Sequence, residues 1–183
     1  MKPVEVVYLV IGAIFGFIGV ARTYARELGS TLVILVAIFL LSLLEDQAID
    51  YLTIGGERLF AVTSDATNLF LSLTFSILFI SIIFASYSGR TFGVPSFGGK
   101  PLGAPEGTLL SLAIGLLNGY LVAGTLWYYQ DRFGYPLQSF GWISLPLTPT
   151  GQELVALLPQ RLFESPVYWM VPVAVLIIFL VRG

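Results

Sequence analysis

Charged side chains divide the chain into long uncharged stretches, and the lengths of these stretches predict its elements. Five stretches are predominantly apolar and cover residues 6–21, 28–44, 66–89, 107–130 and 165–181. A helix rises about 1.5 Å per residue, so about 20 apolar residues cross a hydrocarbon core of about 30 Å. We therefore predict one all-α transmembrane domain over residues 1–183. Its expected spans cover about residues 4–21, 28–44, 68–88, 108–130 and 166–181.

A sixth uncharged stretch, residues 133–152, contains three prolines and three glycines. These residues would break a helix, and a broken backbone exposed to lipid cannot satisfy its amide groups. Further along, Leu154, Leu157, Leu158 and Leu162 share one helical face. This spacing predicts a short helix that lies in the membrane interface before the fifth span, interrupted at Pro159. We therefore expect residues 131–165 to lie outside the membrane.

Small residues recur every fourth position in the fourth stretch, at Ser111, Gly115 and Gly119, and Gly12 and Gly16 repeat the spacing in the first. Residues four apart lie on one face of a helix. Small side chains let two helix backbones approach closely in lipid, where van der Waals contact holds helices together. We predict that the fourth span is the central packing helix and that its glycine face meets the Gly12–Gly16 face.

The connector between the first two spans carries Arg22, Arg26 and Glu27. Arginines in a short loop are typical of a membrane surface, and Glu27 is close enough in sequence to pair with either arginine. We interpret the connector as a solvated helix–helix turn with interfacial arginines. The alternative is a site for an anion or a lipid headgroup.

Two further patterns concern the ends of the predicted spans. Residues 47–65 are acidic, which favours a solvated loop with a short helix. Aromatic side chains end the fourth span and begin the fifth, which predicts an aromatic belt on one side of the membrane. Its residues are Trp127, Tyr128, Tyr129, Tyr168 and Trp169.

Basic residues in the short loops predict the orientation of the chain. Arg22 and Arg26 lie in the first loop, and Arg90 and Lys100 lie in the third, on the same side by parity. Short cytoplasmic loops carry an excess of Lys and Arg. We therefore expect the N-terminus outside the cytoplasm and the C-terminus inside it.

Composition narrows the classes of function. The 183 residues are 56% hydrophobic and only 11% charged, whereas soluble domains carry about 25% charged residues. A net charge of -2 gives no sign of a nucleic-acid partner, and the sequence has no cysteine or histidine. Zinc, copper and haem sites use mainly imidazole or thiolate ligands, and histidine is the commonest general base. We expect no enzyme and no cofactor held covalently or by metal ligation; a lipid, a quinone or a carotenoid could contact the aromatic faces.

Three short motifs resemble the colicin V production protein family of bacterial inner-membrane proteins. Residues 22–27, RTYARE, match the family's R-G-F-x-R-E at both arginines and the glutamate, with Thr23 in place of glycine. Gly115 and Gly119 match its glycine repeat, and residues 142–144, WIS, are similar to its W-x-x-S element. The resemblance implies four family-like spans followed by an additional fifth. It also implies a place in the bacterial cytoplasmic membrane, a link to colicin V export and envelope maintenance, and no enzymatic activity.

The sequence leaves three hypotheses about function. We expect no acidic or basic residue inside any span, and carriers and pumps usually need such residues. This favours a structural, accessory subunit that packs with lipids and with other transmembrane subunits of a larger complex. A respiratory or photosynthetic electron-transfer complex is an example. The alternatives are an independent factor in colicin or peptide export or envelope homeostasis, and a channel or transporter with a pore lined by Asn118. For Asn118 we favour a hydrogen bond to a neighbouring helix.

Overall fold

The computed structural model describes residues 3–60, 64–88, 103 and 105–182. No strand is present in these parts of the chain, and the all-α prediction is confirmed. The elements, in order, are α1 (Val4–Arg22), α2 (Tyr24–Phe60), α3 (Ser64–Tyr87), α4 (Glu106–Arg132), η1 (Pro136–Phe140), α5 (Pro149–Ala156), α6 (Pro159–Leu162) and α7 (Pro166–Arg182).

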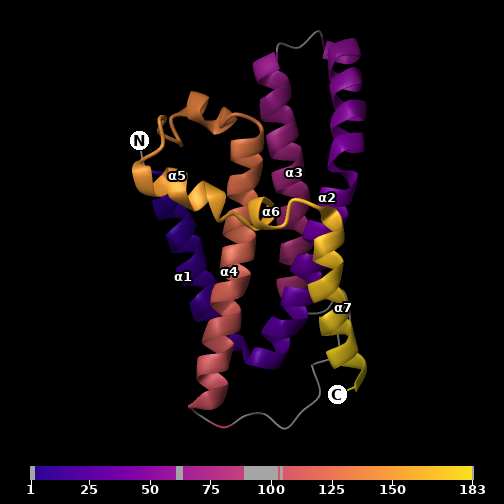
Figure 1. Ribbon diagram of the computed structural model, residues 1–183. Helices are drawn as coiled ribbons and strands as arrows, with labels where there is room; N and C mark the ends of the chain where they lie inside the picture. The colour runs from indigo at the N-terminus through magenta and orange to yellow at the C-terminus, as the bar shows by residue number, and fades with distance from the viewer. Residues whose placement is uncertain (1–2, 61–63, 89–102, 104, 183) are drawn as a thin grey trace.

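Four helices, α1 to α4, are long and apolar enough to cross a membrane. They run roughly alongside one another, α5 lies across the N-terminal end of α1, and α6 lies beside α4 at about mid-height of the bundle (Figure 1). The predicted fifth span corresponds to α7, whose 17 residues give a length of about 25 Å. Its apolar part, Pro166–Phe179, is shorter than the other four, although α7 descends beside α2 towards the end that holds the α1–α2 turn (Figure 1).

The prediction for α2 is wrong at both ends. The helix begins at Tyr24, inside the predicted connector, and continues for 37 residues through most of the predicted acidic loop. Its final turns and the first turns of α3 extend past the end of α4 (Figure 1). No proline interrupts Tyr24–Phe60, and Glu, Gln, Ala and Leu are good helix formers whether or not they face lipid. The apolar stretch therefore ends well before the helix does.

The main core lies where α2, α3 and α4 meet. Ile34 and Ile38 of α2 are fully buried there, together with Phe79 of α3 and Tyr129 of α4. A larger share of α2 and α4 is buried than of α1 and α3. Helices α2 and α4 are therefore the inner helices of the bundle, and α1 and α3 pack on the outside.

The seam between α1 and α4 brings backbone against backbone. A Cβ atom added to Gly119 would lie 2.7 Å from the Cα of Gly12. One added to Gly115 would lie 2.5 Å from the carbonyl oxygen of Phe15 and 3.2 Å from the Cα of Gly16. Real Cβ atoms do not come this close to backbone atoms, so the two helices can approach only because these positions lack side chains.

The same seam continues towards the end of α1. A Cβ atom on Gly19 would lie 2.4 Å from the carbonyl oxygen of Ser111, which is itself buried. A Cβ atom on Gly16 would meet a methyl carbon of Leu116 at 2.8 Å. The small residues predicted to pack all lie along this antiparallel pair of helices, and Gly19 extends the contact by one turn.

The segment after α4 differs from the predicted interfacial helix. It contains two short helices, α5 and α6, and Pro159 begins the second of them. Proline suits the first turn of a helix but cannot continue a preceding one, so the two helices are separate. Leu158 is buried while Leu157 and Leu162 are exposed, so the leucines do not share one face as predicted.

The predicted aromatic belt is also wrong for most of its members. Trp127, Tyr129 and Trp169 are buried side chains of the two apolar clusters. Tyr128 packs partly against the main cluster, and only Tyr168 is largely exposed. The reason is tertiary packing, because Trp127 lies in a cluster with Val4 of α1 and Ile143 of the loop after α4, while Tyr129 and Trp169 lie in the main cluster.

Candidate functional site

The α1–α2 turn forms a polar site inside the bundle. A single residue, Thr23, separates the two helices, and its φ of 76° and ψ of 148° lie in a region that is nearly restricted to glycine. This sharp reversal brings Arg22 at the end of α1 back over the first turns of α2. The Arg22 Nη1 atom lies 3.0 Å from Oε1 of Glu27.

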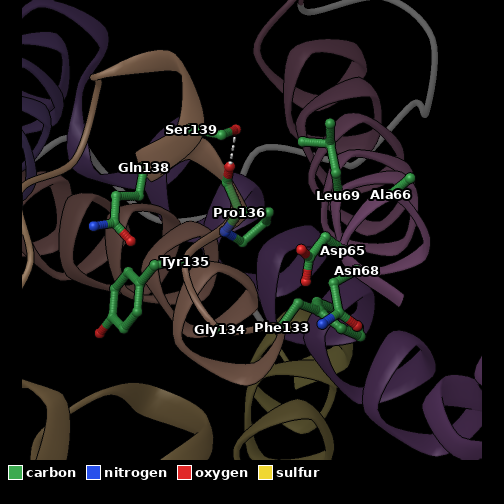
Figure 2. A pocket seen from close by; sticks show the side chains of 10 residues that line it. All are labelled: Asp65, Ala66, Asn68, Leu69, Phe133, Gly134, Tyr135, Pro136, Gln138 and Ser139. Carbon is green, nitrogen blue, oxygen red and sulfur yellow. Dashed lines mark hydrogen bonds between the residues drawn. The ribbon is translucent and has the colours of Figure 1, made fainter. Parts of the chain in front are cut away.

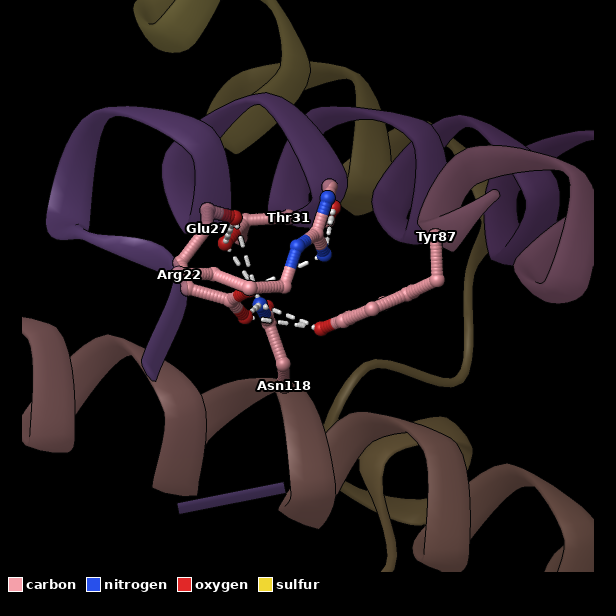
Figure 3. Close-up of polar contacts among 6 residues, drawn as sticks. Arg22, Glu27, Thr31, Tyr87 and Asn118 are labelled. Atoms are coloured by element: carbon pink, nitrogen blue, oxygen red, sulfur yellow. Dashed lines mark hydrogen bonds and ion pairs between the residues drawn. The ribbon is translucent and has the colours of Figure 1, made fainter. Parts of the chain in front are cut away.

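Glu27 is fully buried, and the side chains that bind its carboxylate come from three other helices (Figure 3). Its Oε1 atom accepts the hydrogen bond from Arg22 of α1. Its Oε2 atom accepts from the Tyr87 hydroxyl of α3 at 2.8 Å and from Nδ2 of Asn118 of α4 at 2.9 Å. A buried charge is costly unless it is paired and hydrogen-bonded, and three helices together meet that requirement here.

Further contacts fix the orientation of these partners. The Thr31 hydroxyl donates to Oδ1 of Asn118 at 2.7 Å, which leaves the Asn118 amide nitrogen pointing at Glu27. Arg22 also donates to the Ser30 hydroxyl at 3.2 Å. The Arg22 guanidinium carbon lies 4.3 Å from the centroid of the Tyr87 ring, which adds a cation–π contact. The site is therefore a closed network in which α1, α3 and α4 all bind one carboxylate of α2.

The prediction for the connector is wrong. It is not a solvated turn, since Glu27 is fully buried and only Arg26 of its charged residues is largely exposed. Glu27 and Glu45 also lie in the membrane-length part of α2, Tyr24–Ile54, directly beyond the two ends of the span predicted over residues 28–44. The sequence held two signals for this site, the possible Arg22–Glu27 pair and the lone amide of Asn118 in an apolar helix. Our interpretation did not connect them.

A second buried glutamate, Glu45, lies near the opposite end of the apolar part of α2. Its Oε1 atom accepts from Nε of Arg132 at 3.0 Å and from the Tyr128 hydroxyl at 3.2 Å, both of which belong to α4. Arg132 also approaches Asp46 at 3.8 Å, and both of those side chains are exposed. This pair therefore lies at a surface of the bundle.

A third polar group holds the segment after α4 in place. Arg161 of α6 donates to Oδ2 of Asp131 at 2.6 Å, and the Tyr135 hydroxyl donates to its Oδ1 at 3.0 Å. Tyr135 in turn accepts from Nε1 of Trp127 at 3.2 Å. Burial raises the pKa of the Tyr135 phenol, so the group remains a neutral donor.

A hollow of about 650 Å³ lies beside the first turns of α3, next to the loop that follows α4 (Figure 2). Its polar side chains are Asp65, Asn68, Gln138 and Ser139, and Phe133 and Leu69 contribute apolar wall. The Ser139 hydroxyl donates to the carbonyl oxygen of Pro136, which fixes that side of the loop. The volume is in the range of ligand sites, but the hollow has one exposed carboxylate and no buried polar group aimed into it.

No protein-family model, curated protein or solved structure matches this chain. Its function must therefore be inferred from the contacts of its own residues. Among these, the Glu27 network is the most distinctive, because it joins four helices around a buried charge.

Proposed function

We propose that this protein is a non-catalytic subunit of a larger membrane complex, such as a respiratory or photosynthetic electron-transfer complex, and that it serves as a structural scaffold. The observation that supports this proposal is that the hydrogen-bonding capacity of the Glu27 carboxylate is used within the protein. Both of its carboxylate oxygens are bound by side chains of the same protein, from three other helices.

An ionisable group inside a membrane segment is by default a candidate for transport or proton transfer. Such a role requires the group to exchange its partner for the transported ion or proton. Glu27 has no exposed surface, and its partner Arg22 carries a permanent opposite charge. The network is therefore better suited to holding helices in one arrangement than to passing an ion.

The outer helices supply surfaces for lipids and for other transmembrane subunits. Phe17 on α1 and Phe84 on α3 are among the most exposed apolar side chains of the bundle. Because these rings add little to the core of this chain, their partners would be lipid tails or apolar helices of a neighbouring subunit. A quinone or a carotenoid held at such a boundary is compatible with the same surfaces.

Purification from native membranes tests the proposal. A tagged chain extracted in mild detergent should be recovered with companion transmembrane proteins at a fixed stoichiometry, as measured by native mass spectrometry. Phe17→Ala and Phe84→Ala form a matched pair, since each removes one exposed ring and leaves the core intact. We expect one of them to lower recovery of the companions without lowering thermal stability. Recovery of the wild-type chain only as a stable monomer would refute the proposal.

The orientation proposed for this subunit places the N-terminus outside the cytoplasm of a bacterium and the C-terminus inside it. The α1–α2 turn, with Arg22 and Arg26, would then face the cytoplasm. A reporter fused after Gly183 should be active in the cytoplasm. Activity outside it would mean that α7 does not cross the membrane or that the whole chain is inverted.

A role in peptide export or envelope homeostasis is the second candidate. It is favoured by the residues of the family-like motif, because Arg22 and Glu27 form the buried pair and Thr23 has a backbone conformation that suits glycine. Deletion of the gene should then alter colicin secretion or envelope stress while membrane complexes remain intact. Loss of a complex together with the phenotype would instead favour the subunit.

A further inference from the structure

An exposed pair of aromatic rings lies at the end of η1 and in the loop that leads from it to α5. Trp142 is 68% exposed, whereas the other two tryptophans, Trp127 and Trp169, are 3% and 2% exposed. The Phe140 ring is also exposed, with its centroid 6.3 Å from that of Trp142. Neither ring contributes to the two apolar clusters of the protein.

The backbone fixes the outward direction of these rings. Ile143, the residue after Trp142, is buried in a cluster with Val4, Trp127 and Leu158. The Trp142 amide donates to the carbonyl oxygen of Leu137 at 3.3 Å. A loop anchored at Ile143 cannot turn Trp142 inward without withdrawing the isoleucine, so the exposure of the ring is built into the fold.

The same anchor places the rings at the level of the membrane boundary. Val4 is the first residue of α1, and Trp127 lies in the last two turns of α4. Both helices are long and apolar enough to span a membrane, and α1 begins where α4 ends. Trp142 therefore lies close to the plane where the apolar helices emerge. Tryptophan is enriched at that depth, because its ring is mostly apolar and its N–H can bind water or headgroups.

We propose that Phe140 and Trp142 form a lipid anchor that inserts into the boundary between headgroups and acyl chains. The occupant is lipid because the surface continues that of the spanning helices. Val6 and Val7, which follow Val4 at the same end of α1, are exposed and apolar. The anchor would hold the segment from η1 to α6 against the bilayer. This proposal does not depend on whether the protein is a subunit of a larger complex.

Fluorescence of Trp142 tests this proposal directly. The protein is reconstituted into phosphatidylcholine vesicles whose acyl chains are brominated either near the headgroup or near the chain end. In the Trp127→Phe/Trp169→Phe variant, Trp142 is the only tryptophan, and excitation at a wavelength that tyrosine does not absorb isolates its emission. Bromines near the headgroup should remove most of its emission, bromines near the chain end should remove little, and the water-soluble quencher iodide should have a weak effect.

A second measurement covers the case in which losing two buried tryptophans prevents folding. The single variants Trp142→Phe and Trp169→Phe each retain two tryptophans and form a matched pair. Quenching by shallow bromines should be much smaller in Trp142→Phe than in Trp169→Phe. Strong quenching of Trp142 by iodide together with no quenching by either lipid would place the ring in water and overturn the proposal. That outcome would identify the rings as a surface open to a protein partner.

Discussion

The two ends of the apolar part of α2 each bury a glutamate, but with different surroundings. Glu27 is fully buried, and its partners Arg22, Tyr87 and Asn118 come from α1, α3 and α4. The arginine is itself mostly covered, with 21% of its side chain exposed. At this end, α1, α3 and α4 each contribute a side chain that binds the Glu27 carboxylate. Together with α2, these are the four helices that are long enough to span a membrane.

At the other end, Glu45 receives both of its partners, Arg132 and Tyr128, from α4 alone. The Arg132 side chain is 45% exposed, so water can compete for it. The same types of side chain thus form two different structures. The Glu27 site ties the bundle together from within, whereas the Glu45 site closes one helix pair near a surface.

The largest expected effect on stability is the difference between replacing Arg22 and replacing Arg132. Arg22→Leu leaves Glu27 buried with an uncompensated charge, which should cost about 3–5 kcal/mol in the free energy of unfolding. Arg132→Leu leaves Glu45 with the Tyr128 hydroxyl and with access to water, so its cost should be about 1 kcal/mol or less. Denaturant unfolding in detergent micelles measures both. Equal costs would mean that the two ends are equivalent and that the comparison above is wrong.

The glycine seam offers the next largest effect, because it positions the helix that carries Arg22. Gly115→Ala would place a methyl group 2.5 Å from the Phe15 carbonyl oxygen and force α1 away, at a cost of about 1–3 kcal/mol. Gly124→Ala, nearer the Glu45 end, would meet Pro159 of the short helix α6, so a smaller loss of about 1 kcal/mol is expected. Leu117→Ala, at an exposed position of α4, should change stability by less than about 0.5 kcal/mol.

The unfolding midpoint of each variant in detergent provides the measurement. If Leu117→Ala were damaging and Gly115→Ala neutral, α4 would present its glycine face to lipid rather than to α1. A loss of stability in Gly115→Ala that disappears in the Arg22→Leu background would show that the seam acts through the Glu27 site.

The difference between these two sites also explains what the sequence could reveal. Helix length and the spacing of Gly115 and Gly119 depend on local periodicity, and the number of residues needed to cross lipid is set by geometry. The four long helices and the small-residue faces could therefore be predicted from residues near one another in the chain. The end of α2 could not, because the change from apolar to acidic residues ends the apolar stretch and not the helix, which continues to Phe60.

The Glu27 network depends on contacts that no local pattern contains. Tyr87 is 60 residues from Glu27 in the sequence and Asn118 is 91 residues away. A glutamate that follows two arginines in a short connector is typical of a solvated turn, and Glu27 is buried only because residues of α3 and α4 pack against it. The burial of Trp127 was missed for the same reason, since the residues packed around it include Val4 of α1 and Ile143 and Leu158 of the segment after α4.

Replacing Tyr87 or Tyr128 by phenylalanine compares the contribution of one tyrosine hydroxyl at each end. Tyr87→Phe removes the donor at 2.8 Å from buried Glu27 but keeps the ring beneath Arg22, and should cost about 1.5 kcal/mol. Tyr128→Phe removes hydrogen bonds of 3.2 and 3.3 Å to Glu45, where Arg132 remains, and should cost about 0.5 kcal/mol. Both changes delete one oxygen atom, so their unfolding free energies can be compared directly. A greater loss for Tyr128→Phe would place the stronger network at the Glu45 end.

The one expected gain in stability concerns the turn that forms the Glu27 site. Thr23 has a Cβ atom in a backbone region where side chains are strained by about 1–3 kcal/mol. Thr23→Gly should relieve this strain, offset in part by the greater freedom of glycine in the unfolded chain, for a net gain of about 1 kcal/mol. Thr23→Ala retains the Cβ atom and should give no comparable gain. A loss of stability in Thr23→Gly would show that the threonine side chain makes a larger contribution than its strain.

A double-mutant cycle measures whether the strain at Thr23 depends on the Arg22–Glu27 ion pair. A strained residue persists only where its surroundings determine the backbone, and the Arg22–Glu27 ion pair closes the chain around Thr23. In the Arg22→Leu background the turn can relax, so the gain from Thr23→Gly should shrink towards zero. In the Arg132→Leu background the ion pair is intact, and the gain should remain about 1 kcal/mol. Equal gains in both backgrounds would mean that the helices α1 and α2, and not the buried ion pair, impose the conformation of Thr23.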